Sequence, residues 1–233
     1  MATHEYVHPE LLVETEWLEE HISDSDIRIV DCDSLDAYLR THIPGAVSVG
    51  KDHYIKDPDF ALHVMAPEKI ADFFGRMGIG NDTLVIAYEG RNSPCAARLW
   101  WVLNYYGHSR VKILNGGFRT WFAEDRPTTA EVPNVEKREF VPKTDESLII
   151  RGNDLKSVIS NNESIIWDVR SEGEYSGETT RGNRNTGHVP GAVHLEWNNM
   201  VESDGTGKFK PASEIASLLN AKGISADKQV YTY

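Results

Sequence analysis

The 233-residue sequence has few cysteines, an excess of acidic over basic residues, and no long hydrophobic runs. Cys32 and Cys95 are too few for a disulfide scaffold, so we expect a protein of the reducing cytoplasm. Against 24 Lys and Arg stand 36 Asp and Glu, and the net charge of −12 argues against nucleic acid or an anionic membrane as a partner. No apolar stretch approaches the about 20 residues of a membrane-spanning helix. The polar, acidic start is not typical of a secretory signal peptide.

The rest of the composition is that of a folded globular protein. Hydrophobic residues make up 40% of the chain and aromatic residues 9%, which argues against intrinsic disorder. A length of 233 residues is enough for one large domain or two modest ones, with a buried core in either case.

An internal repeat decides between one domain and two. The second copy follows the first at an offset of 137 residues, and it carries nine extra residues, rich in Gly, Asn and Arg, before its second matching segment. Three ungapped segments match: 11–31 with 148–168, 42–47 (HIPGAV) with 188–193 (HVPGAV), and 68–88 with 213–233. Three such matches in the same order predict two homologous halves.

Helical and strand patterns alternate along the first half. We expect helices at 10–22, 67–76 and 95–106, and strands at 27–31, 46–49, 83–88 and 111–114. This alternation predicts an α/β protein in which helices cover a parallel sheet. The predicted boundaries are an N-terminal domain at 1–123, a proline-containing linker at 124–147 and a C-terminal domain at 148–233.

The loop after the strand at 83–88 has the layout of an anion site. Loop N–H groups and the start of the helix near Cys95 would point at one place, and a cysteine at the loop's first position would act as a thiolate. Glu89 occupies that position, and its negative charge predicts that the first half does not react with anions. The equivalent position of the second half follows Tyr233, at the end of a stretch that is typical of a strand.

Four motifs together resemble the two-domain rhodanese family of thiosulfate and 3-mercaptopyruvate sulfurtransferases. They are the two HxPGA segments, AARLWW at 96–101 and LNGGFRTW at 114–121, and the resemblance extends from Leu11 to Tyr233. It implies two homologous rhodanese-like α/β domains, each a parallel sheet flanked by helices, with the second one incomplete in this chain.

The resemblance also implies a chemistry. In this family the first domain is catalytically silent, in agreement with Glu89, and a cysteine directly after the equivalent of Tyr233 opens the active-site loop. Its thiolate takes the outer sulfur of a small anionic donor as a persulfide and passes it to cyanide or a thiol, without a metal or organic cofactor. We therefore expect a sulfurtransferase whose nucleophile lies beyond Tyr233, and no activity in the 233-residue chain itself.

Three arginines of the second half are the expected substrate-binding residues, because the donor is an anion. Arg170 matches a family position near the substrate, and its counterpart in the first half is Asp33. Arg181 and Arg184 lie in the nine-residue insertion, where a guanidinium could hold a sulfonate or carboxylate with two hydrogen bonds. The plainer interpretation of these two is solvated surface charge.

Two further residues bear on the substrate. Glu174 stands where vertebrate-type members commonly have arginine, so thiosulfate and 3-mercaptopyruvate both stay open as donors. His63 matches a position from which some members send a side chain across the domain interface, with an ordinary loop histidine as the alternative. Arg170, in turn, has the alternative of a surface ion pair with Glu172 or Glu174.

The other histidines and the cysteines have structural interpretations. His42 and His188 precede Pro-Gly in both halves, including the half without a nucleophile, which indicates a turn-forming role. Cys95, at a helix start that would lower its pKa, comes too late in the loop to be the nucleophile and lacks the Cys-x5-Arg spacing of cysteine phosphatases. Cys32 follows a strand and is typical of a small buried side chain.

The alternative function is that of a catalytically inactive tandem rhodanese module with a binding or regulatory role. The residue after Tyr233 separates the two hypotheses, because only the enzyme needs cysteine there. The physiological acceptor and the oligomeric state stay open at this point.

Overall fold

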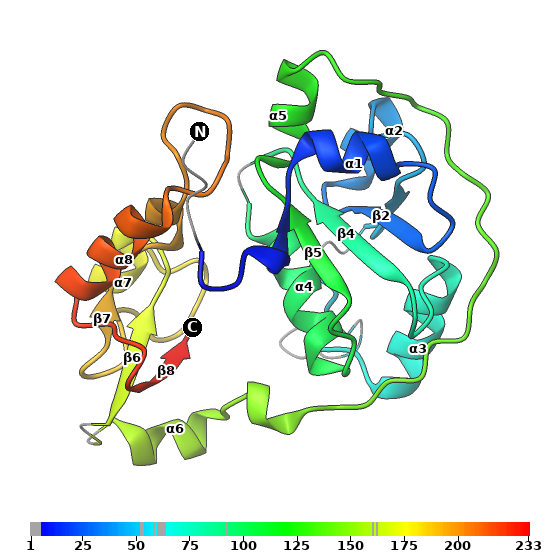
Figure 1. Ribbon diagram of the computed structural model, residues 1–233. Helices are drawn as coiled ribbons and strands as arrows, with labels where there is room; N and C mark the ends of the chain where they lie inside the picture. Colours follow the sequence, from blue (N-terminus) through cyan, green and yellow to red (C-terminus); the bar gives the residue numbers. More distant parts are fainter. Residues whose placement is uncertain are drawn as a thin grey trace. The chain divides into compact units, whose positions relative to one another are not determined.

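The structure is a computed structural model that describes residues 6–51, 54–57, 59, 64–91, 93–159, 161 and 163–233. The chain divides into two compact units (Figure 1). The N-terminal unit comprises His8–Glu146 and Ser203–Lys208, and the C-terminal unit comprises Ser147–Glu202 and Phe209–Tyr233 together with Tyr6 and Val7. Each unit is built around a sheet of its own.

The N-terminal unit contains a five-stranded parallel sheet with the order β1-β5-β4-β2-β3. Its strands are β1 (Leu12–Val13), β2 (Ile27–Asp31), β3 (Val47–Ser48), β4 (Leu84–Tyr88) and β5 (Val111–Leu114). Its helices are η1 (Pro9–Leu11), α1 (Thr15–His21), α2 (Leu35–Arg40), α3 (Pro67–Arg76), α4 (Cys95–Tyr105) and α5 (Gly117–Ala123). Helices and strands therefore alternate, as the sequence pattern predicts.

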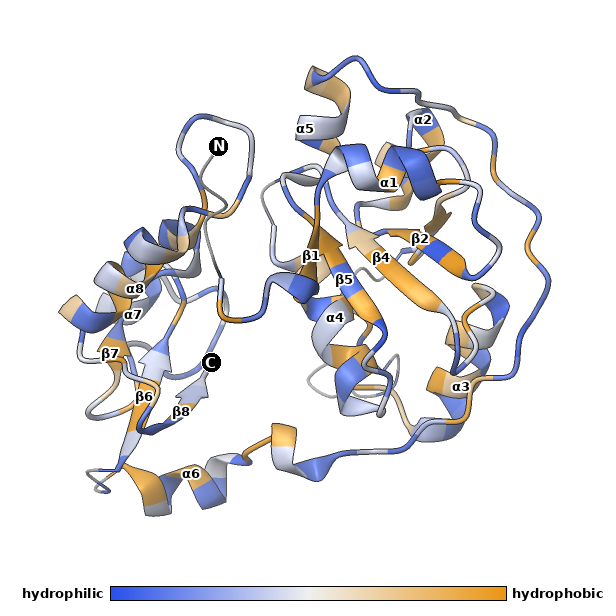
Figure 2. Cartoon of the chain, in the orientation of Figure 1, coloured by the Kyte–Doolittle hydropathy of each residue, from blue (hydrophilic) through white to orange (hydrophobic). Residues whose placement is uncertain are grey.

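Continuous apolar runs explain the central strands of this sheet. β2 and β4 read IRIVD and LVIAY, the pattern of strands that are covered on both faces. β4 is buried from Val85 to Tyr88, and α4 buries Leu99, Val102 and Leu103. Figure 2 shows the apolar character of β4. Burial of such side chains is the dominant favourable contribution to folding.

The C-terminal unit contains a three-stranded parallel sheet with the order β7-β6-β8. Its elements are α6 (Gly152–Val158), β6 (Ser164–Asp168), α7 (Glu172–Ser176), β7 (Val193–His194), η3 (Trp197–Met200), α8 (Ala212–Ala221) and β8 (Gln229–Thr232), and η2 (Glu146–Leu148) precedes them. Ile165, Leu195, Met200 and Ile224 form its buried core. In the described parts of both units, no helix has the length and apolar character to cross a membrane.

Equivalent residues of the two halves are paired in the same way within each sheet, which confirms the repeat. Val30 pairs with Ala87 between β2 and β4, and the repeat-equivalent residues Trp167 and Thr232 pair between β6 and β8. The α/β class and the parallel sheets flanked by helices are also confirmed. The predicted boundaries after residues 123 and 147 stay predictions.

The helix prediction over 10–22 is wrong in its first part. Leu12–Val13 forms β1, which pairs in parallel with β5, and α1 begins only at Thr15. The reason is tertiary, because Ile113 and Leu114 of β5 pair with the two residues of β1. This pairing overrides the local helical pattern. The sequence pattern also does not predict the short helices α2 and α5.

Candidate functional site at the carboxyl ends of the strands

Polar side chains gather where the three strands of the C-terminal unit end. β6 ends at Asp168, β7 ends at His194, and Tyr233 directly follows β8. Asp168 and His194 are ladder partners, and the main-chain N–H of Tyr233 donates to the carbonyl of Trp167 at 3.3 Å. Open parallel sheets bind ligands beyond this edge, so it is the candidate site.

Arg170 is fixed at this edge by the carboxylate of Asp168. Its Nε lies 2.9 Å from Asp168 Oδ1 and its Nη2 lies 2.5 Å from Oδ2, which makes a bidentate ion pair. Nη2 also donates to the carbonyl of Gly187 at 2.9 Å, and the guanidinium carbon lies 4.9 Å from the ring centroid of Tyr233. The Asp168 side chain is fully buried, whereas that of Arg170 keeps 27% of its surface exposed. A cation is therefore anchored at the edge and still reaches solvent.

The ion pair determines the charge of both partners. Burial favours the neutral form of Asp168, but the hydrogen bonds and charge of Arg170 outweigh it and hold the pKa of Asp168 below its usual value. The same hydrogen bonds raise the pKa of Arg170. The alternative of an ion pair with Glu172 or Glu174 is wrong, because the buried carboxylate two residues earlier binds the guanidinium instead.

The N-terminal unit has the same framework with the opposite charge. Asp31, the counterpart of Asp168, accepts a hydrogen bond from the hydroxyl of Tyr88 at 2.7 Å. Asp33 stands in the place of Arg170. Burial raises the pKa of Asp31 to about 6, and the negative charge of Asp33 adds to the shift. At this position the positive charge belongs to the C-terminal unit alone.

The carboxylate of Glu89 occupies the anion site of the loop after β4 in the N-terminal unit. Its Oε2 accepts from the main-chain N–H of Arg91 at 2.6 Å and from that of Ser93 at 3.2 Å. We call this set of loop N–H groups the loop cradle. The N–H of Gly90 donates to Asp33 Oδ2 at 2.8 Å. Burial raises the pKa of Glu89, and the hydrogen bonds from the loop oppose this shift. These N–H groups are engaged by the chain's own side chains, which keeps them from an outside anion.

The two insertion arginines lie on the surface, and no contact joins either of them to Arg170 in the described part of the chain. Arg181 Nε lies 3.0 Å from Glu174 Oε1, and the Arg181 side chain is 66% exposed. Glu174 also accepts a hydrogen bond from the Ser171 hydroxyl at 2.8 Å, in the capping box that begins α7. Arg184 is exposed and forms no hydrogen bond or ion pair with a described residue. Substrate contacts of Arg181 and Arg184 stay predictions.

The paired histidines form turns. His42 Nδ1 lies 2.7 Å from the carbonyl oxygen of Tyr38, and the two rings stack with centroids 4.0 Å apart. His188 repeats this arrangement with Tyr175, at 2.9 Å and 3.8 Å. The same contacts in both units support the turn-forming interpretation. The remaining histidine of the predicted site, His63, lies outside the described residues.

Both cysteines are buried, Cys32 with 0% and Cys95 with 2% of its surface exposed. Burial raises the pKa of each thiol, and nearby carboxylates add to the shift. The expectation that the start of α4 lowers the pKa of Cys95 is wrong, because lost hydration outweighs the hydrogen bonds to the thiol. Neither thiol has the surroundings of a nucleophile. Among the described residues, no group of His, Cys, Asp and Glu is placed to hold a metal ion.

His194 belongs to the edge, although the sequence analysis does not identify it. Its Nε2 lies 2.8 Å from the carbonyl oxygen of Arg170, and its Nδ1 lies 3.0 Å from Glu172 Oε2. Its ring also stacks on that of Tyr175 at 4.6 Å. Because a carbonyl only accepts, Nε2 carries the proton of this hydrogen bond. The repeat contains a signal for this residue, since its counterpart in the first half is Ser48.

A known domain family matches the chain in both halves. The model of the rhodanese-like domain covers residues 14–124 and 152–233, with one match in each copy of the repeat. The chain belongs to the rhodanese family. Its two parallel-sheet units are two rhodanese-like domains.

Proteins of several organisms are similar to this chain. The sulfur carrier protein TtuD of Thermus thermophilus is 37% identical, over 98% of this chain and 83% of that protein. A thiosulfate sulfurtransferase of Corynebacterium glutamicum is 32% identical, over 99% of this chain and 79% of that protein. The crystal structure of SseA from Escherichia coli, described among 3-mercaptopyruvate sulfotransferases, matches with a TM-score of 0.84 at 26% identity, over 95% of this chain and 87% of that one. The rhodanese similarity thus extends over nearly the whole chain.

Proposed function

We propose that the full-length protein is a sulfurtransferase. It moves a sulfane sulfur from thiosulfate or 3-mercaptopyruvate to cyanide or a thiol, through a persulfide on a cysteine directly after Tyr233. The observation that carries the proposal is the cation of Arg170 at the end of β6, where the N-terminal unit has Asp33. The relatives named thiosulfate sulfurtransferase and 3-mercaptopyruvate sulfotransferase support the same class of reaction.

In this proposal, a residue after Tyr233 would lie at the carboxyl ends of the strands. The Tyr233 hydroxyl accepts a hydrogen bond from the N–H of Val189 at 2.9 Å, which anchors the side chain under the turn before β7. Tyr88 has the equivalent place in the N-terminal unit, and the residue after it, Glu89, turns its side chain into the loop cradle. By the repeat, a cysteine after Tyr233 would direct its sulfur into the same kind of cradle, next to Arg170.

The proposed reaction consists of two sulfur transfers. The thiolate attacks the outer sulfur of thiosulfate, the S–S bond of the donor breaks, and sulfite leaves with the bonding electron pair. Cyanide then attacks the outer sulfur of the enzyme persulfide, so that thiocyanate forms and the thiolate is restored. With 3-mercaptopyruvate the C–S bond breaks, and the departing enolate takes a proton to give pyruvate. Negative charge develops beside Arg170 in each case, where a fixed cation stabilises it.

The charged groups of the edge have separate roles in this proposal. Arg170 stabilises the thiolate and the departing anion, and Asp168 positions Arg170 through its two hydrogen bonds. Arg181 and Arg184 bind the sulfonate or carboxylate end of the donor.

The test is an assay of the full-length protein with thiosulfate and cyanide, with thiocyanate as the measured product. We expect turnover that is lost when the cysteine after Tyr233 is replaced by serine. The same assay with 3-mercaptopyruvate decides between the donors by their kcat/KM values. A residue other than cysteine after Tyr233, or no turnover with either donor, would contradict the proposal.

A second candidate is a tandem rhodanese module that binds a partner without catalysis. It is favoured by the N-terminal unit, where Glu89 engages the loop N–H groups that would otherwise bind an anion. This candidate predicts that no persulfide forms when the full-length protein is incubated with thiosulfate, whereas the enzyme predicts one.

A further inference from the structure

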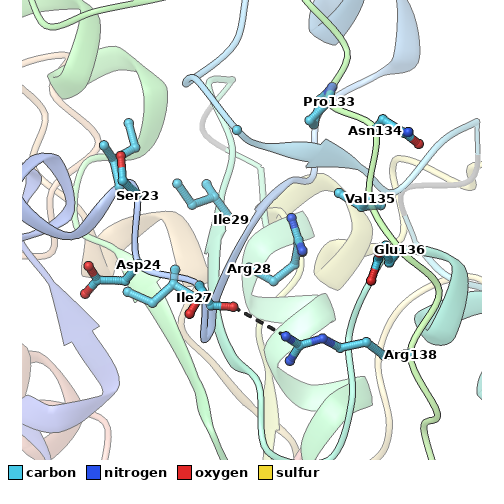
Figure 3. A pocket seen from close by; sticks show the side chains of 13 residues that line it. Ser23, Asp24, Ile27, Arg28, Ile29, Pro133, Asn134, Val135, Glu136 and Arg138 are labelled. Carbon is cyan, nitrogen blue, oxygen red and sulfur yellow. Dashed lines mark hydrogen bonds between the residues drawn. The ribbon is translucent and has the colours of Figure 1, made fainter.

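The N-terminal unit contains a pocket that the proposed sulfur transfer does not use. The pocket has a volume of about 340 Å³ and lies between the start of β2 and the linker residues 133–138 (Figure 3). β3 pairs only with Val30 and Asp31, so within the described structure the first half of β2 has no ladder partner on that side. This unpaired stretch lines one side of the pocket and the linker lines the other. The pocket is therefore at the opposite end of β2 from the carboxyl edge.

Arg28, the second residue of β2, lines the pocket, and its guanidinium forms no hydrogen bond with a described residue. Its Nε is buried without a hydrogen bond, and no carboxylate of the described residues forms an ion pair with it. Burial lowers the pKa of Arg28, and the charge of Arg138 lowers it further. Because this Nε atom is inaccessible, a ligand in the pocket would be bound by the terminal Nη1 and Nη2 donors of the guanidinium.

Arg138 approaches the same pocket from the linker and is held in place. Its Nη1 donates to the Thr83 hydroxyl at 3.1 Å, and its Nη2 donates to the carbonyl of Ser25 at 3.4 Å, the bond drawn in Figure 3. The carboxylate of Asp82 lies 3.8 Å from Nη1. Because these donors are engaged, Arg138 adds positive potential to the pocket, while Arg28 supplies the free hydrogen-bond donors.

The remaining lining indicates the size and charge of a ligand. Ile29 and Val135 form apolar walls, and the two acidic side chains of the pocket are Asp24 and Glu136. Figure 3 shows these acids on opposite sides of the pocket. A ligand with several negative charges would be repelled by them, whereas a single carboxylate on Arg28 leaves the rest of the ligand against the apolar walls.

We propose that this pocket binds a small organic monocarboxylate, with its carboxylate on Arg28 and its apolar part against Ile29 and Val135. The planar guanidinium fork matches a carboxylate with two parallel hydrogen bonds. The position equivalent to Arg28 in the second half is Ile165, so only the N-terminal unit has this cation. The site does not depend on the sulfurtransferase proposal.

The test follows the Nε–H signal of Arg28 in the NMR spectrum of the ¹⁵N-labelled full-length protein while sodium butyrate is added. Its absence from the spectrum of Arg28→Met assigns the signal. We expect a saturable shift in the wild type and in the control Arg110→Met, which removes an exposed arginine of the same unit. Acetate should bind about 10-fold more weakly, because it buries two fewer methylene groups.

The midpoint of thermal unfolding gives a second readout. At matched ionic strength, butyrate should raise the midpoint of the wild type and of Arg110→Met but not that of Arg28→Met. Arg28→Lys keeps the positive charge but loses the two parallel donors of the guanidinium, so it should bind butyrate more weakly than the wild type. If Arg28→Met does not fold, Arg28→Lys takes its place in the comparison. An Arg28 signal unmoved by butyrate, or moved equally by sulfate at the same ionic strength, would overturn the proposal.

Discussion

Arg170 and Asp168 form a bidentate ion pair at the end of β6, with Nε–Oδ1 and Nη2–Oδ2 distances of 2.9 and 2.5 Å. In the N-terminal unit the equivalent positions carry two acids, Asp33 and Asp31. One framework therefore presents a cation in one copy and a pair of carboxyl groups in the other. This difference is the physical basis of the proposal that the C-terminal domain binds the anionic donor.

Replacement of Arg170 by lysine should lower kcat/KM for thiosulfate about 10- to 100-fold, the equivalent of one lost hydrogen bond to a charged group. Lysine keeps the positive charge beside Asp168 but cannot form the fork. Arg170→Met is expected to destabilise the fold by about 3–5 kcal/mol, because it leaves the carboxylate of Asp168 buried and unpaired. Steady-state kinetics and chemical unfolding measure the two effects.

The control for the Arg170 variants is Arg110→Met, which should leave both kcat/KM and the free energy of unfolding within a small margin of the wild type. In the double variant Arg170→Met/Asp168→Asn, most of the lost stability should return and the activity should not. Unchanged kcat/KM in Arg170→Lys and Arg170→Met would show that Arg170 has no part in the reaction.

The two strand-end aspartates should titrate far apart. The pKa of Asp31 is expected at about 6 because of burial, and that of Asp168 below the ordinary 3.8 because of Arg170. Carbon-detected NMR of the side-chain carboxyl groups measures both. Titration of both residues near the ordinary value would contradict the electrostatic account of the two units.

The raised pKa of Asp31 also predicts how stability depends on pH. The folded protein binds this proton more tightly than the unfolded chain, so the contribution of Asp31 is fully present below about pH 4 and is lost as the pH rises to about 6. A difference of about two pKa units corresponds to about 3 kcal/mol. Asp31→Asn should therefore make the free energy of unfolding fall less steeply over this range. An unchanged slope would count against the shift.

Removal of the Glu89 carboxylate should open the N-terminal loop to anions. In Glu89→Ala the N–H groups of Arg91 and Ser93 lose their acceptor, so sulfate should bind there and shift their amide signals. Glu89→Gln keeps an acceptor oxygen and is the matched control, which should respond little. Equal responses of the two variants and the wild type to sulfate would mean that Glu89 does not occupy the cradle in solution.

His194 should act as a positioning residue through the carbonyl of Arg170. His194→Ser introduces the side chain of its repeat counterpart Ser48, and loss of the Nε2–H hydrogen bond should cost about 1 kcal/mol of stability. If His194 orients Arg170, kcat for thiosulfate falls in His194→Ser. Glu172→Gln removes only the contact at Nδ1, so its effect on kcat should be smaller. A loss of stability with unchanged kcat would assign His194 a structural role only.

Much of the fold could be predicted because the repeat and the alternating pattern are local or pairwise features of the sequence. The strands at 27–31 and 111–114 agree with β2 and β5, and the helix at 67–76 agrees with α3. β1 could not be predicted, because two residues carry no periodicity and the strand exists only through its pairing with β5.

The place of Arg170 at the end of a strand could be predicted, but its contacts could not. Comparison of the two copies indicates that Arg170 replaces Asp33, yet the partner of Arg170 is an aspartate two residues away that becomes buried only in the folded sheet. For the same reason the pKa of Cys95 could not be foreseen, since burial of its thiol depends on packing around the start of α4.

The most direct test of the sulfurtransferase account is mass spectrometry of the full-length protein after incubation with thiosulfate. The account predicts the addition of one sulfur atom, located on the cysteine directly after Tyr233 and removed by cyanide as thiocyanate. Absence of the added sulfur, or its location on Cys32 or Cys95, would contradict the account.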